Sequence, residues 1–473
     1  MAAETSSSPG GEISRDDITV TEPGVIRRAV GAAAIGNVTE WYDFGVYGYL
    51  ATTIEPVFFA GLPPAMGTIA TFGIFAVSFL VRPFGGLFFG PLGDRIGRKR
   101  VLSLTVILMA LGTFALGLIP SYASIGVAAP MLALLARLVQ GFSTGGEYGS
   151  AMTFIAEYAP DRRRGFFGSW LETGTMTGYA LGASVATVLT AVLSEPALYS
   201  WGWRIPFFFA LPLGLVGLYL RSKLEDSPAF ERLVQDSEQR EGTPMGQELK
   251  SVFARNWPAL VLCMVMVATW NITNYMLTSY MPTFLTKTLP QSGESGISTT
   301  TSHVLQIIVL VLLMIVLPII GALCDRIGRR PVLFVGCASM VVLAFPSLML
   351  IRAGSAGAVF GGLALMGFML ACFSAVLPSS LPALFPTYVR AGALSIGFNL
   401  SVSAFGGTTS TVMGSLVLVT NDLNWPAYYL IAAGVIGLVA VVFMKESAGR
   451  QLPGSGPTVT TEAEADALVT TSR

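Results

Sequence analysis

The chain has 473 residues, of which 53% are hydrophobic and only 12% are charged, and its formal net charge is zero. Soluble domains carry about 25% charged residues, so this composition is typical of a membrane protein and argues against a soluble enzyme. The balanced charge also argues against nucleic acid as a partner, because phosphate binding requires a concentrated basic surface.

The sequence gives no sign of cofactor, metal or catalytic chemistry. No glycine-rich loop ends in Gly-Lys-Ser/Thr, so ATP chemistry is not indicated, and uphill work would draw on an ion gradient. None of the four cysteines forms a pair with the two-residue gap of a zinc or redox site. The single histidine, His303, excludes a histidine metal site and is expected to be a solvated residue at the outer start of the eighth span.

Twelve apolar segments follow one another along the chain. A membrane helix needs about 20 residues to cross about 30 Å of hydrocarbon, and it tolerates glycine and proline because neighbouring helices satisfy the freed backbone groups. We therefore predict an all-α polytopic membrane protein with twelve transmembrane helices. The predicted spans cover residues 31–55, 67–91, 101–119, 126–158, 165–191, 203–221, 257–285, 302–323, 331–351, 356–384, 391–420 and 426–444.

The lysines and arginines predict how these spans are oriented. Most of the 28 lie in the tails, in the central loop and in the other even-numbered loops, and cytoplasmic loops attract such an excess. The exceptions are Arg204, Lys287 and Arg352 at the opposite side and Arg82 and Arg137 within spans. Both ends of the chain are therefore expected in the cytoplasm.

An internal repeat divides the chain into two halves. Residues 90–102 (GPLGDRIGRKRVL) recur as residues 321–333 (GALCDRIGRRPVL), and nine of the thirteen positions are identical. Each copy follows the second span of a six-span half, which is the arrangement of an alternating-access transporter. The predicted organisation is a cytoplasmic N-terminal tail (1–30), a six-helix half (31–221), a central cytoplasmic loop (222–256), a second six-helix half (257–444) and a short disordered C-terminal tail (445–473).

These loops resemble the signature Gly-x-Leu-x-Asp-Arg-x-Gly-Arg-Lys/Arg of the major facilitator superfamily. Five segments narrow the resemblance to its metabolite:proton symporters: 36–48 (GNVTEWYDFGVYG), 140–148 (QGFSTGGEY), 157–165, 201–207 and 385–390. Four more are most similar to the proline/glycine betaine proton symporters: 168–172 (GSWLE), 217–221, 275–282 (YMLTSYMP) and 426–429 (PAYY). The resemblance implies the major facilitator fold and proton-driven transport of an osmoprotectant.

The sequence departs from that subgroup at the C-terminus. Osmosensing members carry a long extension that ends in a coiled coil, whereas residues 446–473 have no apolar heptads. The departure does not affect the expectation of transport, but it puts coiled-coil tuning of an osmotic threshold in doubt.

Charged side chains within the spans carry most of the functional information, because a charge at mid-bilayer costs about 2.5–3.5 kcal/mol on insertion scales. Glu40 and Asp43 lie in the first span, Glu147 in the fourth and Glu172 in the fifth. Burial favours the neutral form of a carboxyl group, which suits a proton carrier, and we predict that these four acids take part in proton coupling. The alternatives are a permanent salt bridge for Glu40 or Asp43 and a structural role for Glu147 and Glu172.

Arg137 is the predicted partner of a titrating carboxylate, or an anchor for a substrate carboxylate. It lies one helical turn before Gln140, and Gly141 and Gly145 follow on a small-residue face that allows close helix approach. If these glycines face a neighbouring helix, Arg137 faces the centre of the bundle. The alternative role is a static tie between two helices.

A set of aromatic residues near these carboxylates favours a cationic or zwitterionic ligand. Quaternary ammonium groups bind to aromatic faces, and each contact is worth about 0.5–2 kcal/mol. For any single aromatic residue, packing in the core or at the lipid interface is the alternative. The predicted substrate-binding residues are Trp41, Phe44, Tyr47, Trp170, Trp270, Asn271, Asn274, Tyr275 and Tyr280.

The repeated basic loops predict a gate at the cytoplasmic side. Asp94 and Asp325 lie where the two halves would meet, and each can cap a helix N-terminus and pair with an arginine of its loop. Glu157, with the three arginines at 162–164, resembles a further latch. The alternative for the two aspartates is that the charges of their loops only fix the membrane topology. The predicted gating residues are Asp94, Arg95, Arg98, Glu157, Arg163, Asp325, Arg326 and Arg329.

Together these features predict a multi-pass protein of a bacterial inner membrane that imports proline, glycine betaine or ectoine with a proton. Its expected partners are this solute, protons and the lipid bilayer. The nearer alternative is symport of a carboxylate such as citrate, 2-oxoglutarate or shikimate, which an extra buried cation such as Arg82 would favour. A remote alternative is a solute sensor that does not transport. Proton against sodium coupling, the choice of osmolyte and the oligomeric state stay open at this stage.

Overall fold

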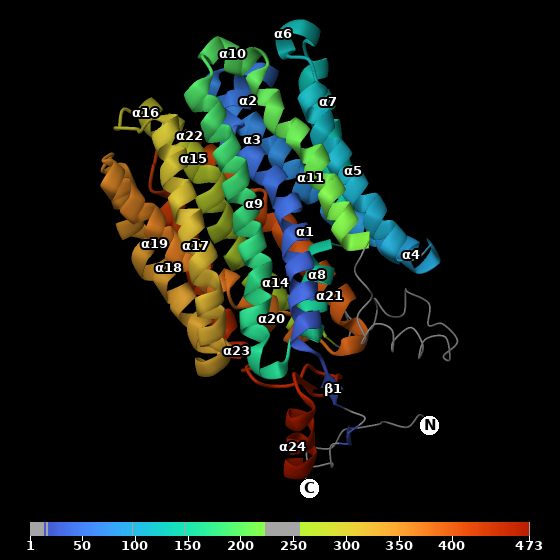
Figure 1. Cartoon of the computed structure of the whole chain (residues 1–473). Coiled ribbons are helices and arrows are strands. Elements are labelled where there is room, and N and C mark those ends of the chain that lie inside the picture. Colours follow the sequence, from blue (N-terminus) through green and yellow to red (C-terminus); the bar gives the residue numbers. More distant parts are fainter. Residues whose placement is uncertain (1–13, 16–17, 97, 146, 223–255, 473) are drawn as a thin grey trace.

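The computed structural model describes residues 14–15, 18–96, 98–145, 147–222 and 256–472. The long helices lie side by side in one elongated bundle (Figure 1). In this described part, nine helical segments are long and apolar enough to cross a membrane. The predicted central loop lies outside the described residues, apart from its two end positions.

The first half of the chain supplies six spans. The first is α1 (Pro23–Tyr49) with α2 (Ala51–Phe58), the second is α3 (Pro64–Leu80) with α4 (Arg82–Ile96), and the third is α5 (Arg98–Leu118). The fourth is α7 (Ala128–Ser143) with α8 (Glu147–Tyr158), the fifth is α9 (Arg164–Val192) and the sixth is α11 (Ile205–Ser222). Short connecting helices are α6 (Tyr122–Ile125), η2 (Asp161–Arg163), α10 (Glu195–Ser200) and η3 (Gly202–Arg204).

The second half supplies the other six. The seventh span begins with α14 (Trp257–Tyr275) and continues through η4 (Met276–Tyr280), α15 (Met281–Thr283), η5 (Phe284–Thr288) and α16 (Leu289–Gln291). It is followed by α17 (Thr299–Ile327), α18 (Arg329–Arg352) and α19 (Ala356–Ser374), with the short α20 (Leu377–Ser380) and η6 (Pro382–Leu384). The eleventh span is α21 (Thr387–Ser401), η7 (Val402–Gly406) and α22 (Thr409–Thr420), and the twelfth is α23 (Trp425–Phe443).

All twelve predicted spans coincide with helices of the structure. The three that are not among the nine apolar helices are the first, third and fourth spans. The first carries buried charges, and the fourth is interrupted between α7 and α8. Of the third, Leu104–Leu118 is apolar within the described part of the chain. The first and fourth spans carry polar groups that lie buried in the bundle, among them Glu40, Asp43, Arg137 and Glu147.

Glycines bring α1 and α9 into close contact. Gly178 and Gly182 of α9 face the backbone of α1 so closely that an added Cβ would lie 2.7 Å from the Val38 carbonyl oxygen and 2.7 Å from the Val46 nitrogen, respectively. Helices in lipid associate through such small residues because hydrocarbon offers no hydrophobic gain. The contact fixes α1, with its acids and aromatic rings, against α9.

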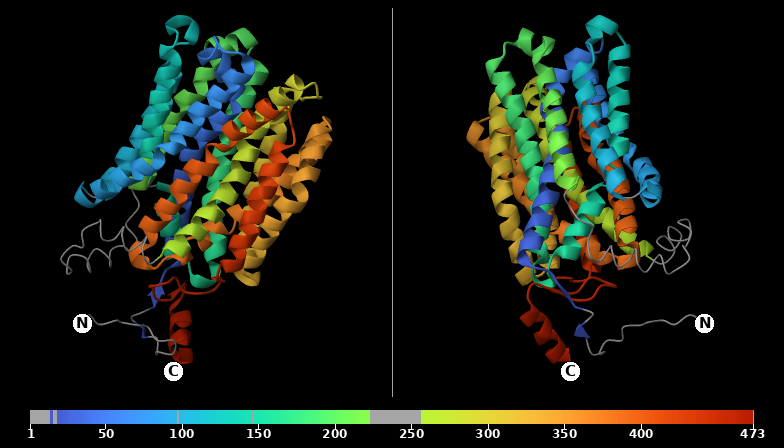
Figure 2. Two further views of the ribbon diagram at one scale, coloured as in Figure 1. Left: turned by 180° about the vertical axis from the view of Figure 1, so that it is seen from behind. Right: turned by 45° about the vertical axis from the view of Figure 1, so that its right-hand side comes forward.

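The two ends of the chain meet at one end of the bundle. β1 (Thr19–Val20) pairs in parallel with β2 (Thr458–Val459), and α24 (Glu462–Ser472) follows at the same end in every view (Figures 1 and 2). We call this end the terminal end, and the other the opposite end.

The C-terminal tail differs from the expected disordered segment. Its carbonyl oxygens at Arg450 and Pro453 accept hydrogen bonds from Arg164 Nη1 at 2.9 Å and Arg390 Nη2 at 2.8 Å. Its Thr458 N–H donates to Asp161 at 3.2 Å. The sequence did not predict these contacts, because the tail lacks apolar periodicity and makes them through its backbone with charged side chains elsewhere in the chain.

Candidate substrate and proton-coupling site

A buried ion pair joins the first and fourth spans. Arg137 Nη1 of α7 lies 2.9 Å from Asp43 Oδ2 of α1, and both side chains are almost completely buried. Gln140 donates to the same Asp43 oxygen and, at 2.9 Å, to Thr113 of α5. The Arg137 guanidinium also lies 4.0 Å above the Tyr47 ring centroid. These contacts form a compact polar cluster within an apolar bundle.

The glycines of the fourth span orient this cluster as predicted. An added Cβ on Gly141 would collide with the backbone of Ser78, and one on Gly145 would lie 2.6 Å from the nitrogen of Gly86, so both glycines face the second span. Arg137 consequently points to α1. Asp43 and Arg137 are confirmed as partners, which is also what the static-tie alternative requires.

A second buried pair lies one turn away on α1. Arg82 Nη2 of α4 is 3.7 Å from Glu40 Oε1, and both side chains are almost completely buried. The Arg82 guanidinium lies 4.8 Å from the Phe44 ring centroid and 4.5 Å from that of Phe79. Arg82 is therefore the extra buried cation considered above, but Glu40 balances its charge.

The remaining two acids lie on α8 and α9. Glu172 of α9 accepts hydrogen bonds from the Tyr148 hydroxyl of α8 and, at 3.1 Å, from Thr175 Oγ1. Glu147 is buried at the first position of α8, next to the interruption of the fourth span. The four predicted acids are thus all buried.

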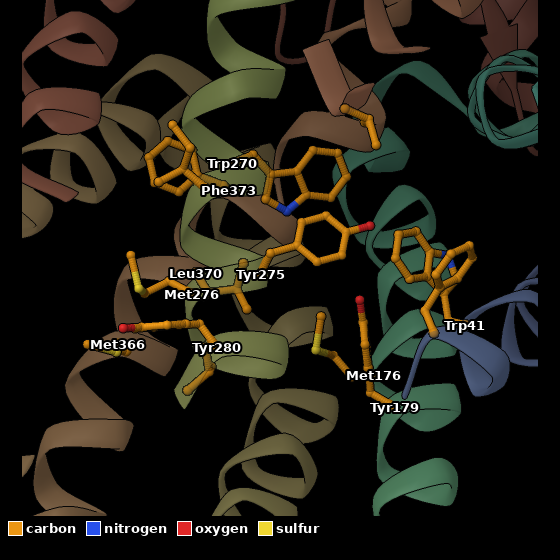
Figure 3. Close-up of a cluster of buried hydrophobic side chains, with 14 of the residues drawn as sticks. Trp41, Met176, Tyr179, Trp270, Tyr275, Met276, Tyr280, Met366, Leu370 and Phe373 are labelled. Carbon is orange, nitrogen blue, oxygen red and sulfur yellow. The ribbon is translucent and has the colours of Figure 1, made fainter. Parts of the chain in front are cut away.

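An aromatic cluster lies beside these acids and contains rings from both halves. The Trp41 centroid is 5.5 Å from Tyr179, 6.0 Å from Tyr148 and 6.3 Å from Tyr275. Figure 3 shows the Tyr275 ring between Trp270 and Trp41, with its hydroxyl directed toward Trp41. We use the name aromatic cluster for Trp41, Tyr148, Tyr179, Trp270, Tyr275 and Phe398.

Several polar atoms in and beside the aromatic cluster are buried and form no hydrogen bond with a described residue. They are the hydroxyl oxygens of Tyr179 and Tyr275 and the Asn274 side-chain oxygen. A buried polar group without a partner costs about 1–3 kcal/mol, so these atoms are suited to a polar ligand. Asn271 instead donates to the carbonyl oxygen of Val267 at 2.9 Å.

The other predicted substrate residues lie at the edge of this cluster or outside it, and Phe44 is the nearest, with its ring centroid 5.5 Å from that of Trp41. Trp170 was predicted wrongly, because its side chain is 39% exposed on the outer surface of α9 and contacts Phe166. Phe44 and Tyr47 cover the two arginines, and Tyr280 packs against Phe284 with a centroid distance of 5.6 Å. Sequence spacing did not identify Tyr148 and Phe398, although Tyr148 lies in the motif QGFSTGGEY.

Contacts between the halves close the terminal end. Asp325 of α17 accepts hydrogen bonds from the backbone N–H groups of Gly165 at 2.7 Å and Phe166 at 2.8 Å, at the first turn of α9. Arg390 Nη1 of α21 lies 2.8 Å from Glu157 Oε1 of α8. The predicted helix cap by Asp325 is confirmed, and it is formed across the two halves.

Other predicted gating residues have different surroundings. Glu157 pairs with Arg390, which was not among the expected partners. Of the arginines at 162–164, Arg163 is exposed and Arg164 is buried and pairs with Asp161. Arg326 is also exposed, and Arg329 is buried against the Ser379 carbonyl oxygen at 3.0 Å. The side chains of Asp94, Arg95 and Arg98 lie outside the described part of the structure.

The halves also meet at the opposite end, where no gate residue was predicted. Lys287 of η5 forms an ion pair with Glu55 of α2, and the Tyr49 hydroxyl donates to Gln306 Oε1 at 3.0 Å. His303 is buried, with its ring 5.2 Å from that of Tyr49. The expectation that His303 is solvated was wrong, because Tyr49 of the first span packs against its ring.

A bundle of two six-helix halves that meet at both ends, with buried charges and rings between them, defines a secondary transporter and not an enzyme. The family model described as "Sugar (and other) transporter" matches residues 29–454, and the chain belongs to this family. Among the described residues, no group of three or more His, Cys, Asp or Glu side chains could hold a metal ion.

Individual relatives cover almost the whole chain. The chain is 44% identical to the proline/betaine transporter of Salmonella typhimurium over 97% of its length and 91% of the relative's length. It is 45% identical, over the same shares, to the glycine betaine/proline/ectoine/pipecolic acid transporter OusA of Dickeya dadantii. The solved structure of the proton:xylose symporter XylE, bound to a bromodeoxyglucose, aligns with a TM-score of 0.72 at 18% identity, over 91% of this chain and 98% of that one. This likeness shows the major facilitator fold.

Proposed function

We propose that the protein imports small zwitterionic osmoprotectants, such as glycine betaine and proline, together with a proton. The observation that carries this proposal is the aromatic cluster, which both halves share and which lies beside balanced buried charges. The names of the relatives point to the same solutes.

The proposed site treats the two ends of a zwitterion differently. Faces of Trp41, Trp270 and Tyr275 attract a methylated ammonium group through the negative potential of their rings. The solute's carboxylate then needs hydrogen-bond donors, and the Tyr275 and Tyr179 hydroxyls supply them from inside the cluster. The same site accepts the ring of proline against these faces.

The proton is proposed to bind within the cluster of Asp43, Arg137 and Gln140. A proton on Asp43 removes the attraction to Arg137, so the tie between the first and fourth spans weakens. Glu40 with Arg82 forms a second pair of this kind. Glu147 and Glu172 complete the proposed coupling group.

Alternating access is proposed to use the contacts at the two ends in turn. The terminal end is assigned to the cytoplasm of a bacterial cell, with the protein in the inner membrane. In the inward-open state, Asp325 leaves the N-terminus of α9 and Arg390 separates from Glu157. In the outward-open state, Lys287 separates from Glu55. The other predicted gate residues are still proposed to act at the terminal end. They are Asp94, Arg95, Arg98, Arg163, Arg326 and Arg329.

The carboxylate alternative has less support. A dicarboxylate would need a surplus of buried cations, whereas Arg82 and Arg137 face Glu40 and Asp43, respectively. Glu147 and Glu172 add further buried acids. A zwitterion, which carries no net charge, fits this balance.

The test is uptake of radiolabelled glycine betaine and proline into proteoliposomes with an inward proton gradient. Accumulation that collapses with a protonophore supports the proposal, and choline, which lacks the carboxylate, should not accumulate. Accumulation of citrate or 2-oxoglutarate without either osmolyte would overturn the substrate assignment while leaving the proton-driven mechanism standing. A sodium gradient that replaces the proton gradient without loss of uptake would overturn the coupling ion.

A further inference from the structure

Tyr148 connects the aromatic cluster to a buried acid. Its ring stacks on Phe398 with a centroid distance of 4.6 Å and lies 6.0 Å from Trp41 and 6.2 Å from Trp270. Its hydroxyl donates a hydrogen bond to Glu172. One side chain therefore touches rings of both halves and an acid that has no arginine within ion-pair distance among the described residues.

We propose that the Tyr148 hydroxyl is a shared donor that binds either ionised Glu172 or the carboxylate of the transported zwitterion, so that a proton on Glu172 favours solute binding. This inference rests on the proposed function. Tyr148 thus acts as a specificity-determining residue for solutes with a carboxylate, and Glu172 acts on the solute through it.

The physical basis is competition for one hydrogen. A tyrosine hydroxyl has a single O–H to donate, and a bond to an ionised acceptor is about twice as strong as one to a neutral acceptor. While Glu172 is ionised, it therefore holds the Tyr148 hydrogen. Once Glu172 is protonated, the solute carboxylate is the stronger acceptor, and the hydroxyl turns to it.

The surroundings of Glu172 suit this exchange. The charged or titratable groups that face it are Tyr148 of α8 and Glu40 of α1, while Thr175 of α9 and Ser374 of α19 are its polar neighbours. Ser374 accepts a hydrogen bond from Trp270 Nε1 at 2.8 Å. The ring proposed to hold the solute's cation therefore lies next to the acid as well.

Glycine betaine binding to the purified full-length protein, measured by calorimetry between pH 5.5 and 8.5, tests the proposal. Wild-type affinity should rise by about 10-fold as the pH falls, which is a typical coupling between two sites. Tyr148→Phe keeps the ring and removes the hydroxyl, so its affinity should stay near the wild-type value at pH 8.5 throughout. Glu172→Gln, which imitates the protonated acid, should bind tightly throughout. Tyr42→Phe is the matched control, since its hydroxyl bonds to the Pro206 carbonyl oxygen at 3.0 Å, outside the cluster.

Each outcome decides one question. If Tyr148→Phe and Glu172→Gln both keep the wild-type pH dependence, the shared-donor proposal is wrong while osmolyte binding stands. If the wild type binds neither glycine betaine nor proline at any pH, the proposed function fails, and this proposal fails with it. Should Tyr148→Phe not fold, as judged by size-exclusion profile, the Glu172→Gln measurement alone decides.

Discussion

At the scale of single residues, the site is defined by which buried side chains have a partner. Asp43 and Arg137 neutralise each other, and so do Glu40 and Arg82, although their nearest atoms are 3.7 Å apart. An isolated charge in this environment would be far more costly than a pair. The rings of the aromatic cluster lie beside these pairs, so a solute with two opposite charges can bind without leaving either pair unbalanced.

The two tryptophans at 270 and 170 give a matched test of the aromatic cluster. Trp270→Ala removes a buried ring and should weaken glycine betaine binding by about 2- to 30-fold, the range expected for one cation–π contact. Trp170→Ala removes a ring that is 39% exposed and should leave affinity unchanged. Equal losses in both variants, measured by calorimetry, would show that the cluster is not the cation site.

The sequence predicted the residue types of the site better than their positions. The buried acids, Arg137 and Trp41 were identified because charge within an apolar span has few structural uses. The sequence did not show that Tyr148 faces the site and that Trp170 does not. A period of 3.6 residues shows which residues share a helix face, but not which neighbour that face packs against. Only the packing of α8 and α9 against neighbouring helices reveals that Tyr148 faces inward and Trp170 outward.

At the scale of helices, the N-terminus of α9 is a contact point between the halves. Its first backbone N–H groups carry partial positive charge, which an acid near the N-terminus stabilises, and Asp325 of α17 provides that acid. The sequence predicted the cap but not its location in the other half. These hydrogen bonds between the halves hold the terminal end closed, and this end can open when they break.

Asp325→Asn should therefore open the terminal end more often. Asparagine offers only one neutral acceptor oxygen, so one charge-assisted hydrogen bond, worth about 1.5–3 kcal/mol, is lost and the other loses its charge. The equilibrium should shift at least about 10-fold toward the open form. Cys324 is a native reporter, since it is buried beside Gly165 in this interface. In a variant that keeps only Cys324, maleimide labelling should accelerate and uptake should fall.

The control for this experiment keeps only Cys337, which is buried within the second half next to Gly437. Its labelling rate should not respond to Asp325→Asn. Equal acceleration at both cysteines would indicate general unfolding and not gate opening, and unchanged labelling of Cys324 would contradict the gate.

The carboxylate of Glu446 joins the start of α18 to the tail. Burial alone raises the pKa of this carboxyl, but hydrogen bonds from the backbone N–H groups of Arg329, Ala448, Arg330 and Ser447 outweigh burial and lower the pKa. A lowered pKa in the folded state stabilises the protein above the unfolded value of about 4.3, and this stabilisation is lost as the pH falls through the folded value.

Glu446→Gln should therefore reduce stability at pH 7 by about 1 kcal/mol, the size of a typical net hydrogen bond. The difference from wild type should shrink as the pH falls below about 4, and thermal denaturation in detergent measures it. Glu462→Gln is the control, since that side chain is 72% exposed in the tail. A difference that stays the same from pH 7 down to the lowest pH at which both proteins are folded would show that the charge of Glu446 is not responsible.

At the scale of the whole molecule, contacts between the halves exist at both ends at once. Glu157 with Arg390 closes the terminal end, and Glu55 with Lys287 closes the opposite end. Alternating access requires that each of these pairs separates during a cycle. A contact within one half has no such requirement, and Glu294 with Arg352 provides an example at the opposite end.

Cysteine pairs at these three places separate the two kinds of contact. In a background without native cysteines, an oxidised pair at 55/287 or at 157/390 should reduce uptake by at least about 10-fold, because the cross-linked end can then no longer open. A reductant should restore uptake. The pair at 294/352 should leave uptake unchanged when oxidised. Transport through either of the first two cross-links would contradict alternating access at that end.

The fold could be predicted from the sequence almost completely, whereas the contacts that close the two ends of the bundle could not. The bundle of two halves is indicated by twelve apolar runs, by the basic loops and by the repeat at 90–102 and 321–333. An apolar segment in hydrocarbon forms a helix because its backbone groups must hydrogen-bond within the protein. The pairs at 55/287 and 157/390 join residues far apart in the chain, and no local pattern predicts them. The tail was missed for the same reason, since its partners are buried arginines elsewhere in the chain.

The central claim is that an osmolyte and a proton cross together and that Asp43 carries or controls the proton. The most direct measurement adds glycine betaine outside proteoliposomes that contain a trapped pH dye and that start without a pH gradient. The wild-type protein should acidify the lumen as glycine betaine enters, and Asp43→Asn should exchange glycine betaine without any acidification. Entry of glycine betaine into wild-type vesicles with no change in lumen pH would contradict the account.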